Sequence, residues 1–485
     1  MPSDRSPAND TRAVIALAAV AALLRFYGLG SESLWLDEGT TVWRIARGYG
    51  QLLFEWDDGT QGPLYYVALK IWCQIFGTTE FALRFPSAVL GVAAIPLVYR
   101  LARRYFDRAT GLVAALLLTV NPFAIHYSQE ARPYALFLLL GVASIGYLLR
   151  LLDRYDRGDA VAYVVASACA FYTHAFAPFL LMAHGAIVLI DRTRAGRERP
   201  ALSLRRAAPI AAALALLCIP QAFAYAKELS DVTAGQSSAN VIPEPTLQFL
   251  GKIFVNYFMS PWHAAAAFLV MTVGLVMAFG AGGRARVSAL MLVAVGACCA
   301  LLPWIVSKVF VPILTERYTI AAFAAAIILV AAGVARMGGA LRAGALAALL
   351  IFAGADLAGY YTLVDKDPWR QTAEHLERES RAGDAIVVFP RWTYRPLDYH
   401  LDEPDGVRVV VPRETDDIGA LAAGANRIFF VESYPGSASL RDAISAHLSA
   451  AYKEESASVI NETLALNPHA YKLKPIRVTL YTRGD

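Results

Sequence analysis

The sequence predicts a polytopic α-helical membrane protein that ends in a small soluble α/β domain. Hydrophobic residues make up 57% of the 485 positions and charged residues only 17%, whereas a soluble protein carries roughly a quarter charged residues. Apolar runs of about 20 residues, the length that crosses a bilayer, recur along most of the chain. After residue 361 short β-rich runs alternate with helical patterns. We therefore expect a transmembrane domain over residues 1–361 and a soluble domain over residues 362–485.

The apolar runs and the charged breaks between them predict about eleven transmembrane helices. The first apolar stretch follows Arg5 and Arg12, is too long for the core of a signal peptide and lacks a clear small-residue cleavage site, so we interpret it as an uncleaved helix. The expected spans are residues 12–30, 83–102, 109–123, 133–150, 159–173, 176–191, 207–226, 262–281, 287–306, 317–335 and 343–361.

Positive charge is distributed unevenly over the breaks. Alternate breaks are rich in Arg, as in Arg103–Arg108 and Arg336–Arg342, and the breaks between them are poor in Lys and Arg. Because cytoplasmic loops carry the excess of Lys and Arg, the basic breaks and the N-terminus are placed in the cytoplasm. An odd number of spans then places the C-terminal domain outside.

Three regions fall on the outer face under this topology. The first is the loop 31–82, in which 41–47 and 64–76 have the apolar spacing of helices that lie in the membrane interface. The second, 227–261, contains several prolines and a Gly/Ser-rich stretch, and we expect a mobile loop there. The third is the C-terminal domain. Its expected strands are 384–389, 407–411, 427–431 and 478–481, and its expected helices are 369–381, 417–423 and 438–450.

An acidic pair, Asp37–Glu38, follows the first span directly. A charge is far less costly at the level of the lipid headgroups than at the bilayer centre. A carboxylate placed there suits deprotonation of an acceptor hydroxyl, and we assign Asp37 as the candidate general base. Two plainer interpretations are that Asp37 caps the helix that follows it and that Glu38 only favours the helix N-terminus.

Several charged residues on the outer face are not explained by topology, because positive charge belongs inside. They are predicted at one membrane level with Asp37, Glu38 and Glu130. Arginine suits a phosphate through its planar fork of donors, which makes the cations candidates for binding the phosphate of a lipid-linked substrate. Alternatives are local ion pairs, snorkelling side chains, and a packing role for the histidine. These candidates are Arg84, Arg132, His174 and Arg317.

A lipid phosphate leaving group and an attacking hydroxyl together define glycosyl transfer from a polyprenyl-phosphate sugar. In that displacement negative charge returns to the phosphate, so nearby cations stabilise the transition state more than the ground state. A single displacement implies inversion at the sugar carbon. No metal is required, although Asp37 and Glu130 are a candidate pair for Mg²⁺ or Mn²⁺. The net charge of +4 gives no indication of nucleic-acid binding.

The same residues carry a family resemblance. The ordered set resembles the dolichyl-phosphate-mannose protein mannosyltransferases and their bacterial relatives, including the lipid A aminoarabinose transferases. The match spans roughly residues 30–400. The motifs are Asp37–Glu38, Gly62–Pro63–Leu64–Tyr65–Tyr66, Arg84–Phe85–Pro86–Ser87, Tyr127–Ser128–Gln129–Glu130–Ala131–Arg132–Pro133–Tyr134, Glu316–Arg317–Tyr318 and Asp367–Pro368–Trp369–Arg370.

The resemblance implies a GT-C fold, inverting transfer in a non-cytoplasmic cavity, and Asp37 as the acceptor-activating carboxylate. It extends the candidate substrate-binding residues to Tyr65, Gln129 and Tyr318. The chain departs from its relatives at Gln61–Gly62–Pro63, where they often have His-Pro-Pro. A histidine contact to the donor or acceptor is therefore replaced, and the identity of the sugar and acceptor stays open.

The function predicted is an inverting glycosyltransferase that moves a sugar, mannose being the family's commonest association, from a polyprenyl phosphate to an acceptor. The acceptor is a protein, a glycolipid or a glycan. A lipid-linked glycan ligase would also use outer loops and remains an alternative. A transporter or flippase predicts charged or broken helices near the midplane, which the spans largely lack. A membrane-anchored receptor would not need so many spans.

Overall fold

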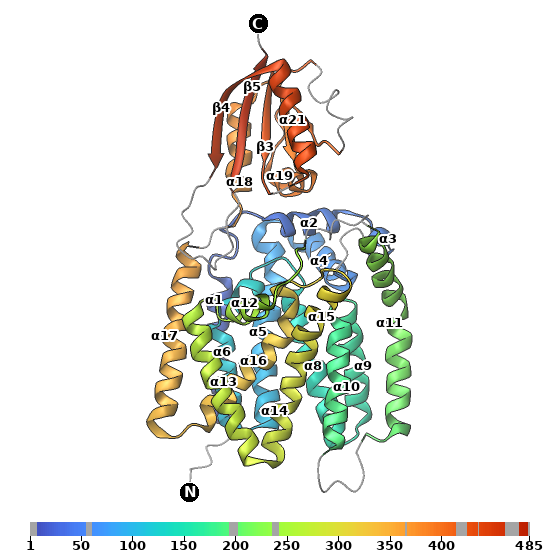
Figure 1. Cartoon of the computed structure of the whole chain (residues 1–485), viewed down its shortest axis with the longest axis vertical. Helices are drawn as coiled ribbons and strands as arrows, with labels where there is room; N and C mark the ends of the chain where they lie inside the picture. The colour runs from blue at the N-terminus through green and yellow to red at the C-terminus, as the bar shows by residue number, and fades with distance from the viewer. Residues whose placement is uncertain are drawn as a thin grey trace. The chain divides into compact units, whose positions relative to one another are not determined.

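The computed structural model describes residues 7–54, 61–193, 202–234, 242–363, 366–413, 424–434, 436–460 and 475–483 (Figure 1). The chain divides into two compact units. The membrane unit comprises Met1–Leu29, Gly48–Gly77 and Ala82–Tyr361, and the tail unit comprises Gly30–Arg47, Thr78–Phe81 and Thr362–Asp485. Two short segments of the chain between the first helix and residue 82, Gly30–Arg47 and Thr78–Phe81, therefore belong to the tail unit.

The membrane unit is built almost entirely from helices. Its described helices are α1 (Pro7–Phe26), α3 (Tyr49–Phe54), α4 (Pro63–Phe76), α5 (Glu80–Tyr105), α6 (Arg108–Val120), α7 (Pro122–Ser128), α8 (Tyr134–Asp153), α9 (Arg157–Phe171), α10 (Ala177–Arg192), α11 (Leu204–Thr233), α12 (Leu247–Tyr257), α13 (Pro261–Ala281), α14 (Gly283–Gly296), the π-helix η2 (Ala297–Leu301), α15 (Leu302–Val309), the 3₁₀ helix η3 (Glu316–Thr319), α16 (Ile320–Arg336) and α17 (Gly339–Leu363).

Every predicted span coincides with a helix. Among the described residues seven helices are long and apolar enough to cross a membrane, or eight if α6 and α7, which meet at a 60° bend, form one broken span. The prediction of about eleven spans also included α1, α9 and α10. α9 and α10 have 15 and 16 residues, and α1 begins with polar residues, so these three fall short of the criterion of length and composition.

Polar residues at the breaks begin the next helices. The side chains of Asp107 and Asn121 accept hydrogen bonds from the backbone N–H groups of Thr110 (2.7 Å) and Ala124 (2.9 Å). Asp156 does the same for Asp159 at 3.1 Å. Such caps satisfy donors that a helix leaves unpaired at its N-terminus. They fix where α6, α7 and α9 begin. Because Gln129, Glu130 and Arg132 follow α7, the start of α7 also fixes where these predicted site residues lie.

Helix α16 is the core of the membrane unit. In the most apolar 18-residue stretch of the span Glu316–Arg336, which contains α16, 89% of the residues are buried inside the protein. A Cβ added to Gly274 of α13 would lie 2.4 Å from the Cα of Gly333 of α16. The two glycines therefore allow the helix backbones to approach closely, as small residues commonly do between membrane helices.

The predicted basic breaks lie together at one end of the helices. Arg104 pairs with Asp153 at 3.4 Å, Arg284 donates to the Arg104 carbonyl at 2.5 Å, and the Arg336 guanidinium lies 5.1 Å from the Phe106 ring. The segments that begin near Arg84, Arg132 and Arg317 run toward this basic end. The candidate cations of the sequence therefore lie at the opposite helix ends.

The predicted loop 227–261 is wrong as a description of the whole region. Helix α11 continues to Thr233, and α12 occupies Leu247–Tyr257. Tyr257 of α12 donates to the hydroxyl of Thr319 at 2.6 Å, and Asn121 donates to the Tyr257 carbonyl at 2.8 Å. The prolines predict a loop, but the buried contacts of Tyr257 with Thr319 and Asn121 hold α12 in place.

The tail unit contains a five-stranded sheet in the order β2-β1-β3-β5-β4. β1 pairs in parallel with β2 and β3, and β5 pairs antiparallel with β3 and β4. Two buried clusters of apolar residues form its cores. The elements are α2 (Leu36–Ala46), α18 (Trp369–Glu379), β1 (Ala385–Phe389), the 3₁₀ helix η4 (Arg391–Thr393), α19 (Tyr394–His400), β2 (Arg408–Val410), β3 (Arg427–Glu432), α21 (Ala438–Ala451), β4 (Tyr452–Ile460) and β5 (Ile476–Arg483).

The small α/β domain is confirmed, with two elements that the sequence prediction missed. Strand β4 is an edge strand whose residues are largely exposed, so it lacks the apolar alternation by which strands are recognised. Helix α19 has only seven residues. The helix predicted at 417–423 lies outside the described residues.

Candidate functional site

The candidate site of the membrane unit is built around the turn between α9 and α10. Gly62 donates its N–H to the Thr173 carbonyl at 3.0 Å, and Leu64 donates to the Tyr172 carbonyl at 3.1 Å. A Cβ on Gly62 would lie 2.1 Å from the Tyr172 oxygen. Only glycine therefore permits this approach of two backbones, which fixes the turn before α4.

His174 lies in that turn and is fully buried. Its Nδ1 accepts the backbone N–H of Phe176 at 3.1 Å. Burial, together with the charges of Arg132 and Arg317, lowers the pKa of His174 to about 3. The ring is therefore neutral at physiological pH, and because Nδ1 accepts, Nε2 carries the proton. Among the described residues Nε2 has no hydrogen-bond partner.

Aromatic rings hold the His174 ring in this orientation. The ring stacks on Phe137 at a centroid distance of 5.1 Å and meets Tyr318 edge-on at 4.8 Å. The guanidinium of Arg317 lies 5.7 Å from the centre of the Tyr318 ring. The structure thus brings together His174, Arg132, Arg317 and Tyr318, four predicted residues that come from three separate segments of the chain. The two arginines supply positive charge and N–H donors, and His174 adds the N–H of Nε2.

Glu130 is a second buried group in the membrane unit. Its Oε1 lies 3.1 Å from Nε2 of His126, and both side chains are nearly inaccessible. Among the described residues its other oxygen, Oε2, has no hydrogen-bond partner. An unsatisfied buried carboxylate oxygen is costly, so it marks a position where a substrate or cation would gain from binding.

Three further residues connect the motifs. The hydroxyl of Tyr65 hydrogen-bonds with that of Ser87 at 2.8 Å, and Ser87 also donates to the Arg132 carbonyl at 3.2 Å. Gln61 donates to the hydroxyl of Tyr134 at 3.3 Å. Tyr65 therefore supports the backbone that carries Arg132, and Gln61 is tied to the start of α8.

Arg84 and Gln129 are engaged with backbone carbonyls. Arg84 is 1% exposed and donates to the Leu29 carbonyl at 3.0 Å. The Gln129 amide donates to the Tyr27 carbonyl at 2.8 Å, and its oxygen accepts the Tyr360 hydroxyl at 2.7 Å. These contacts give both residues a structural role at the end of α1, besides the substrate roles predicted for them.

Asp37 and Glu38 belong to the tail unit and lie in the first turn of α2. The interpretation of Asp37 as a helix cap is wrong, because the N-cap position is Trp35. Glu38 is completely buried, and Lys366 Nζ lies 2.9 Å from its Oε2. Asp37 is half-buried. The acidic pair therefore consists of one carboxylate with a fixed cationic partner and one that is more accessible.

Sequence reasoning missed two residues. Lys366 was overlooked because its partner is more than three hundred positions away in the chain. Arg25 is a buried cation inside the first predicted span; it donates to the carbonyls of Leu118 (3.1 Å) and Thr119 (3.2 Å) and to the Ser128 hydroxyl (3.2 Å). It thereby stabilises the bend between α6 and α7. A lone charge in an apolar span was a signal that could have found it.

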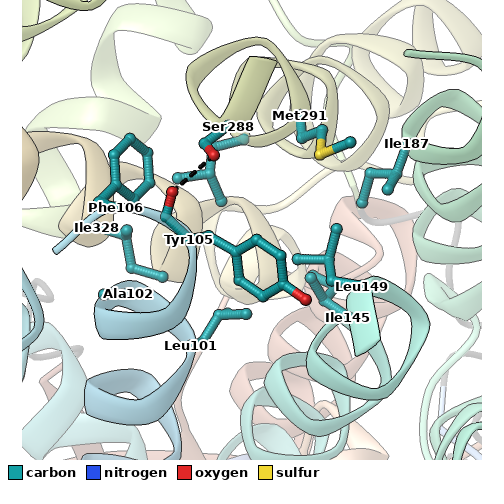
Figure 2. A pocket seen from close by; sticks show the side chains of 11 residues that line it. Leu101, Ala102, Tyr105, Phe106, Ile145, Leu149, Ile187, Ser288, Met291 and Ile328 are labelled. Atoms are coloured by element: carbon teal, nitrogen blue, oxygen red, sulfur yellow. Dashed lines mark hydrogen bonds between the residues drawn. The ribbon is translucent and has the colours of Figure 1, made fainter. Parts of the chain in front are cut away.

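An apolar pocket lies elsewhere in the membrane unit (Figure 2). Residues of α5, α8, α10, α14 and α16 line it, and in Figure 2 the Ser288 hydroxyl donates to the Tyr105 carbonyl, at 2.7 Å. Tyr105 and Leu149 adjoin the basic helix ends. No predicted site residue lines this pocket, so we do not assign the predicted chemistry to it.

The described residues contain no group of three or more His, Cys, Asp and Glu side chains arranged to hold a metal ion. In the membrane unit His126 and Glu130 lie 3.1 Å apart, but they are only two such groups. The divalent cation considered from the sequence therefore stays a prediction.

A protein-family model and one curated relative each match part of this chain. The model of the family described as dolichyl-phosphate-mannose-protein mannosyltransferase matches residues 60–223, the stretch that carries Arg84, Glu130, Arg132 and His174. An uncharacterised protein of Aquifex aeolicus (strain VF5) is 28% identical over 184 residues, which cover 36% of this chain. The match spans only 37% of that relative's length.

Solved structures show the fold. ArnT from Cupriavidus metallidurans in the apo state superposes with a TM-score of 0.63 at 13% identity, covering 96% of this chain and 98% of ArnT. ArnT bound to undecaprenyl phosphate gives a TM-score of 0.60 at 13% identity, covering 96% of this chain and 97% of ArnT. The Archaeoglobus fulgidus oligosaccharyltransferase tethered to an acceptor peptide gives 0.58 at 12% identity, covering 99% of this chain and 74% of that protein.

The chain is a multi-span membrane protein with the GT-C fold. The predicted resemblance to the dolichyl-phosphate-mannose protein mannosyltransferases and the ArnT-type transferases is confirmed by the family match and by the fold. The prediction that it is a glycosyltransferase agrees with these matches.

Proposed function

We propose that this protein is an inverting glycosyltransferase that moves a sugar from a polyprenyl phosphate to an acceptor hydroxyl at the outer face of a bacterial inner membrane. The proposal places the N-terminus in the cytoplasm and the tail domain, residues 362–485, outside. It takes residues 1–361 as the catalytic transmembrane domain. The name of the matching family, and the undecaprenyl phosphate bound to ArnT, support the reaction class.

The observation that carries the proposal is the arrangement around His174. Two arginines and a neutral imidazole with its proton on Nε2 converge from three segments. A phosphate offers several acceptor oxygens and negative charge, and charge-assisted hydrogen bonds of this kind are the strong ones. Negative charge accumulates on the phosphate as the sugar leaves, so these donors favour the transition state over the bound donor.

Asp37 is the proposed general base. It is more accessible than Glu38, whose carboxylate is paired with Lys366. A base has to reach the proton of the attacking hydroxyl. Asp37 is partly exposed as a residue, although its Oδ2 atom is buried. The hydroxyl attacks the anomeric carbon, the bond to the phosphate oxygen breaks, the proton passes to Asp37, and the configuration inverts. Glu130, with one buried oxygen free of described partners, is proposed to bind sugar or acceptor.

Sugar and acceptor are proposed only by class. Mannose is suggested by the name of the matching family, and the acceptor is a protein, a glycolipid or a cell-envelope glycan. A lipid-linked glycan ligase is the second candidate, favoured by the fold shared with the archaeal oligosaccharyltransferase. For a transporter the charged group of interest would be Asp356 in α17, but it pairs with His263 Nδ1 at 2.8 Å, as a structural ion pair would.

The proposal is tested by measuring binding of undecaprenyl phosphate and of undecaprenol to the purified protein in lipid nanodiscs. The two lipids share the isoprenoid chain and differ in the phosphate. We expect labelled undecaprenyl phosphate to bind. Unlabelled undecaprenyl phosphate should displace it, and undecaprenol should not. Equal affinity for both lipids would contradict a donor-phosphate site.

A further inference from the structure

Lys366 is the residue through which the C-terminal segment of the chain meets the acidic pair. Its Nζ donates to Oε2 of Glu38 at 2.9 Å, and its backbone N–H donates to the carboxylate of Glu32 at 3.3 Å. The side chain of Lys366 is 12% exposed and that of Glu38 is 0% exposed. Both residues lie in the tail unit, so this is an ion pair within one compact body.

The rest of α2 is fixed to the same unit. Gly39 packs against Pro396 so closely that a Cβ would lie 2.6 Å from the Pro396 nitrogen. Arg395 donates to the Thr40 hydroxyl at 3.0 Å and lies 4.0 Å above the Trp43 ring. Helix α19 therefore holds one face of α2, and Lys366 holds its first turn.

We propose that Lys366 is a positioning residue for the reaction: its ammonium, paired with the buried carboxylate of Glu38, fixes the first turn of α2, so that Asp37 is held as the base. The inference rests on the proposed function. Lys366 is not proposed to touch the donor or acceptor. The tail domain then contributes to catalysis by holding the acidic pair, without supplying a reacting group.

The physical reason is the cost of a buried charge. A carboxylate removed from water is protonated unless a cation or hydrogen bonds compensate it. Without Lys366, Glu38 would take up a proton or pull toward solvent, and either change displaces the neighbouring residue. A misplacement of about 1 Å in a catalytic group can lower turnover by roughly 100-fold.

The test compares sugar transfer by the full-length protein in nanodiscs for wild type, Lys366→Met, Lys366→Arg, Glu38→Gln and the double variant Glu38→Gln/Lys366→Met. Arg427→Gln is the matched control, because it removes a different ion pair of the tail unit, that with Asp384 at 2.7 Å. Thermal melting is recorded for each protein.

We expect Lys366→Met to lower kcat by about 10- to 100-fold, with little change in KM for the donor. Lys366→Arg should restore part of kcat, and the double variant should be less impaired than the two single losses combined, since the residues act as a pair. Arg427→Gln should lower only the melting temperature.

Full kcat in Lys366→Met beside an active wild type overturns the inference and leaves the proposed function standing. The inference also fails if Lys366→Met and Arg427→Gln lose activity only in proportion to their loss of melting temperature. Absence of transfer by the wild type with every donor overturns the proposed function, and the inference with it.

Discussion

His174 accepts the backbone N–H of Phe176 through Nδ1 at 3.1 Å, and this bond places the ring proton on Nε2. The two residues are neighbours in one turn, so the tautomer is set locally. Burial of the ring, together with the charges of Arg132 and Arg317, then keeps it from gaining a second proton. His174 is accordingly a neutral donor over the range in which free histidine titrates.

The low pKa of His174 predicts a pH dependence of stability. The folded-state pKa is about 3, below the value of about 6.5 in an unfolded chain. Between these values the unfolded state binds the proton and the folded state does not. This contribution to stability is complete above about pH 6.5 and declines as the pH falls, by at most about 1.4 kcal/mol per pH unit.

Thermal melting between pH 7 and pH 5 measures this effect. In His174→Asn the amide oxygen can still accept from Phe176 but nothing titrates, so the melting temperature should fall less steeply with acidification than that of the wild type. His375→Asn, in α18 of the tail unit, is the control and should follow the wild type. Parallel curves for wild type and His174→Asn would contradict the assignment of a neutral buried ring.

Removal of either arginine should weaken donor binding. A hydrogen bond to a charged group contributes about 1.5–3 kcal/mol, which corresponds to roughly 10- to 100-fold in affinity. We expect Arg132→Gln and Arg317→Gln each to raise the Kd for undecaprenyl phosphate by this factor. Arg336→Gln, at the other end of the segment that Arg317 begins, is the matched control. An unchanged Kd in Arg317→Gln would remove that residue from the donor site.

The membrane fold could be predicted well from the sequence. Apolar runs have a length fixed by the bilayer, and the basic breaks give each helix a direction. Arg84, Arg132 and Arg317 were therefore assigned to one level before any contact was known. The same argument placed His174 there from its position between two spans. What it did not give is the tautomer of His174, because that depends on one backbone bond inside the turn.

Other features could not be predicted because they depend on distant contacts or lack a periodic pattern. Lys366 and Glu38 are far apart in the sequence and meet only in the folded tail unit, so no local sequence pattern predicts that pair. The edge strand β4, with Lys453, Glu454 and Glu455 exposed, resembles a charged loop. Arg25 was visible as a charge within a span, but its carbonyl partners at the bend after α6 were not.

Chelation is expected to leave transfer unchanged. The positive charge opposite the donor phosphate is assigned to Arg132 and Arg317, and the Nε2–H of neutral His174 adds a hydrogen-bond donor, so no divalent cation is needed for that task. Transfer is measured before and after dialysis against EDTA, with Mg²⁺ or Mn²⁺ added back. Loss of activity that either metal restores would contradict this assignment and make Glu130 a candidate ligand, since carboxylates bind these ions.

Gly62→Ala should destabilise the membrane unit and reduce donor binding. Its Cβ would lie 2.1 Å from the Tyr172 carbonyl oxygen, so the two paired backbones must separate, at a cost of about 1–3 kcal/mol as for overpacked sites. The turn that carries His174 would then shift. Gly50→Ala is the control, because a Cβ there meets nothing within 4 Å. Equal melting temperatures for Gly62→Ala and Gly50→Ala would show that this close approach of two backbones contributes nothing to stability.

The central claim is tested most directly by sugar transfer itself. Wild type and Asp37→Asn, reconstituted in lipid, are given radiolabelled polyprenyl-phosphate sugars and a membrane extract that supplies acceptors, and folding is checked by thermal melting. We predict a labelled product of inverted anomeric configuration from the wild type, and a loss of about 100- to 10,000-fold in Asp37→Asn, as for removal of a general base. Equal turnover by the two proteins, or retention of configuration in the product, would contradict the account.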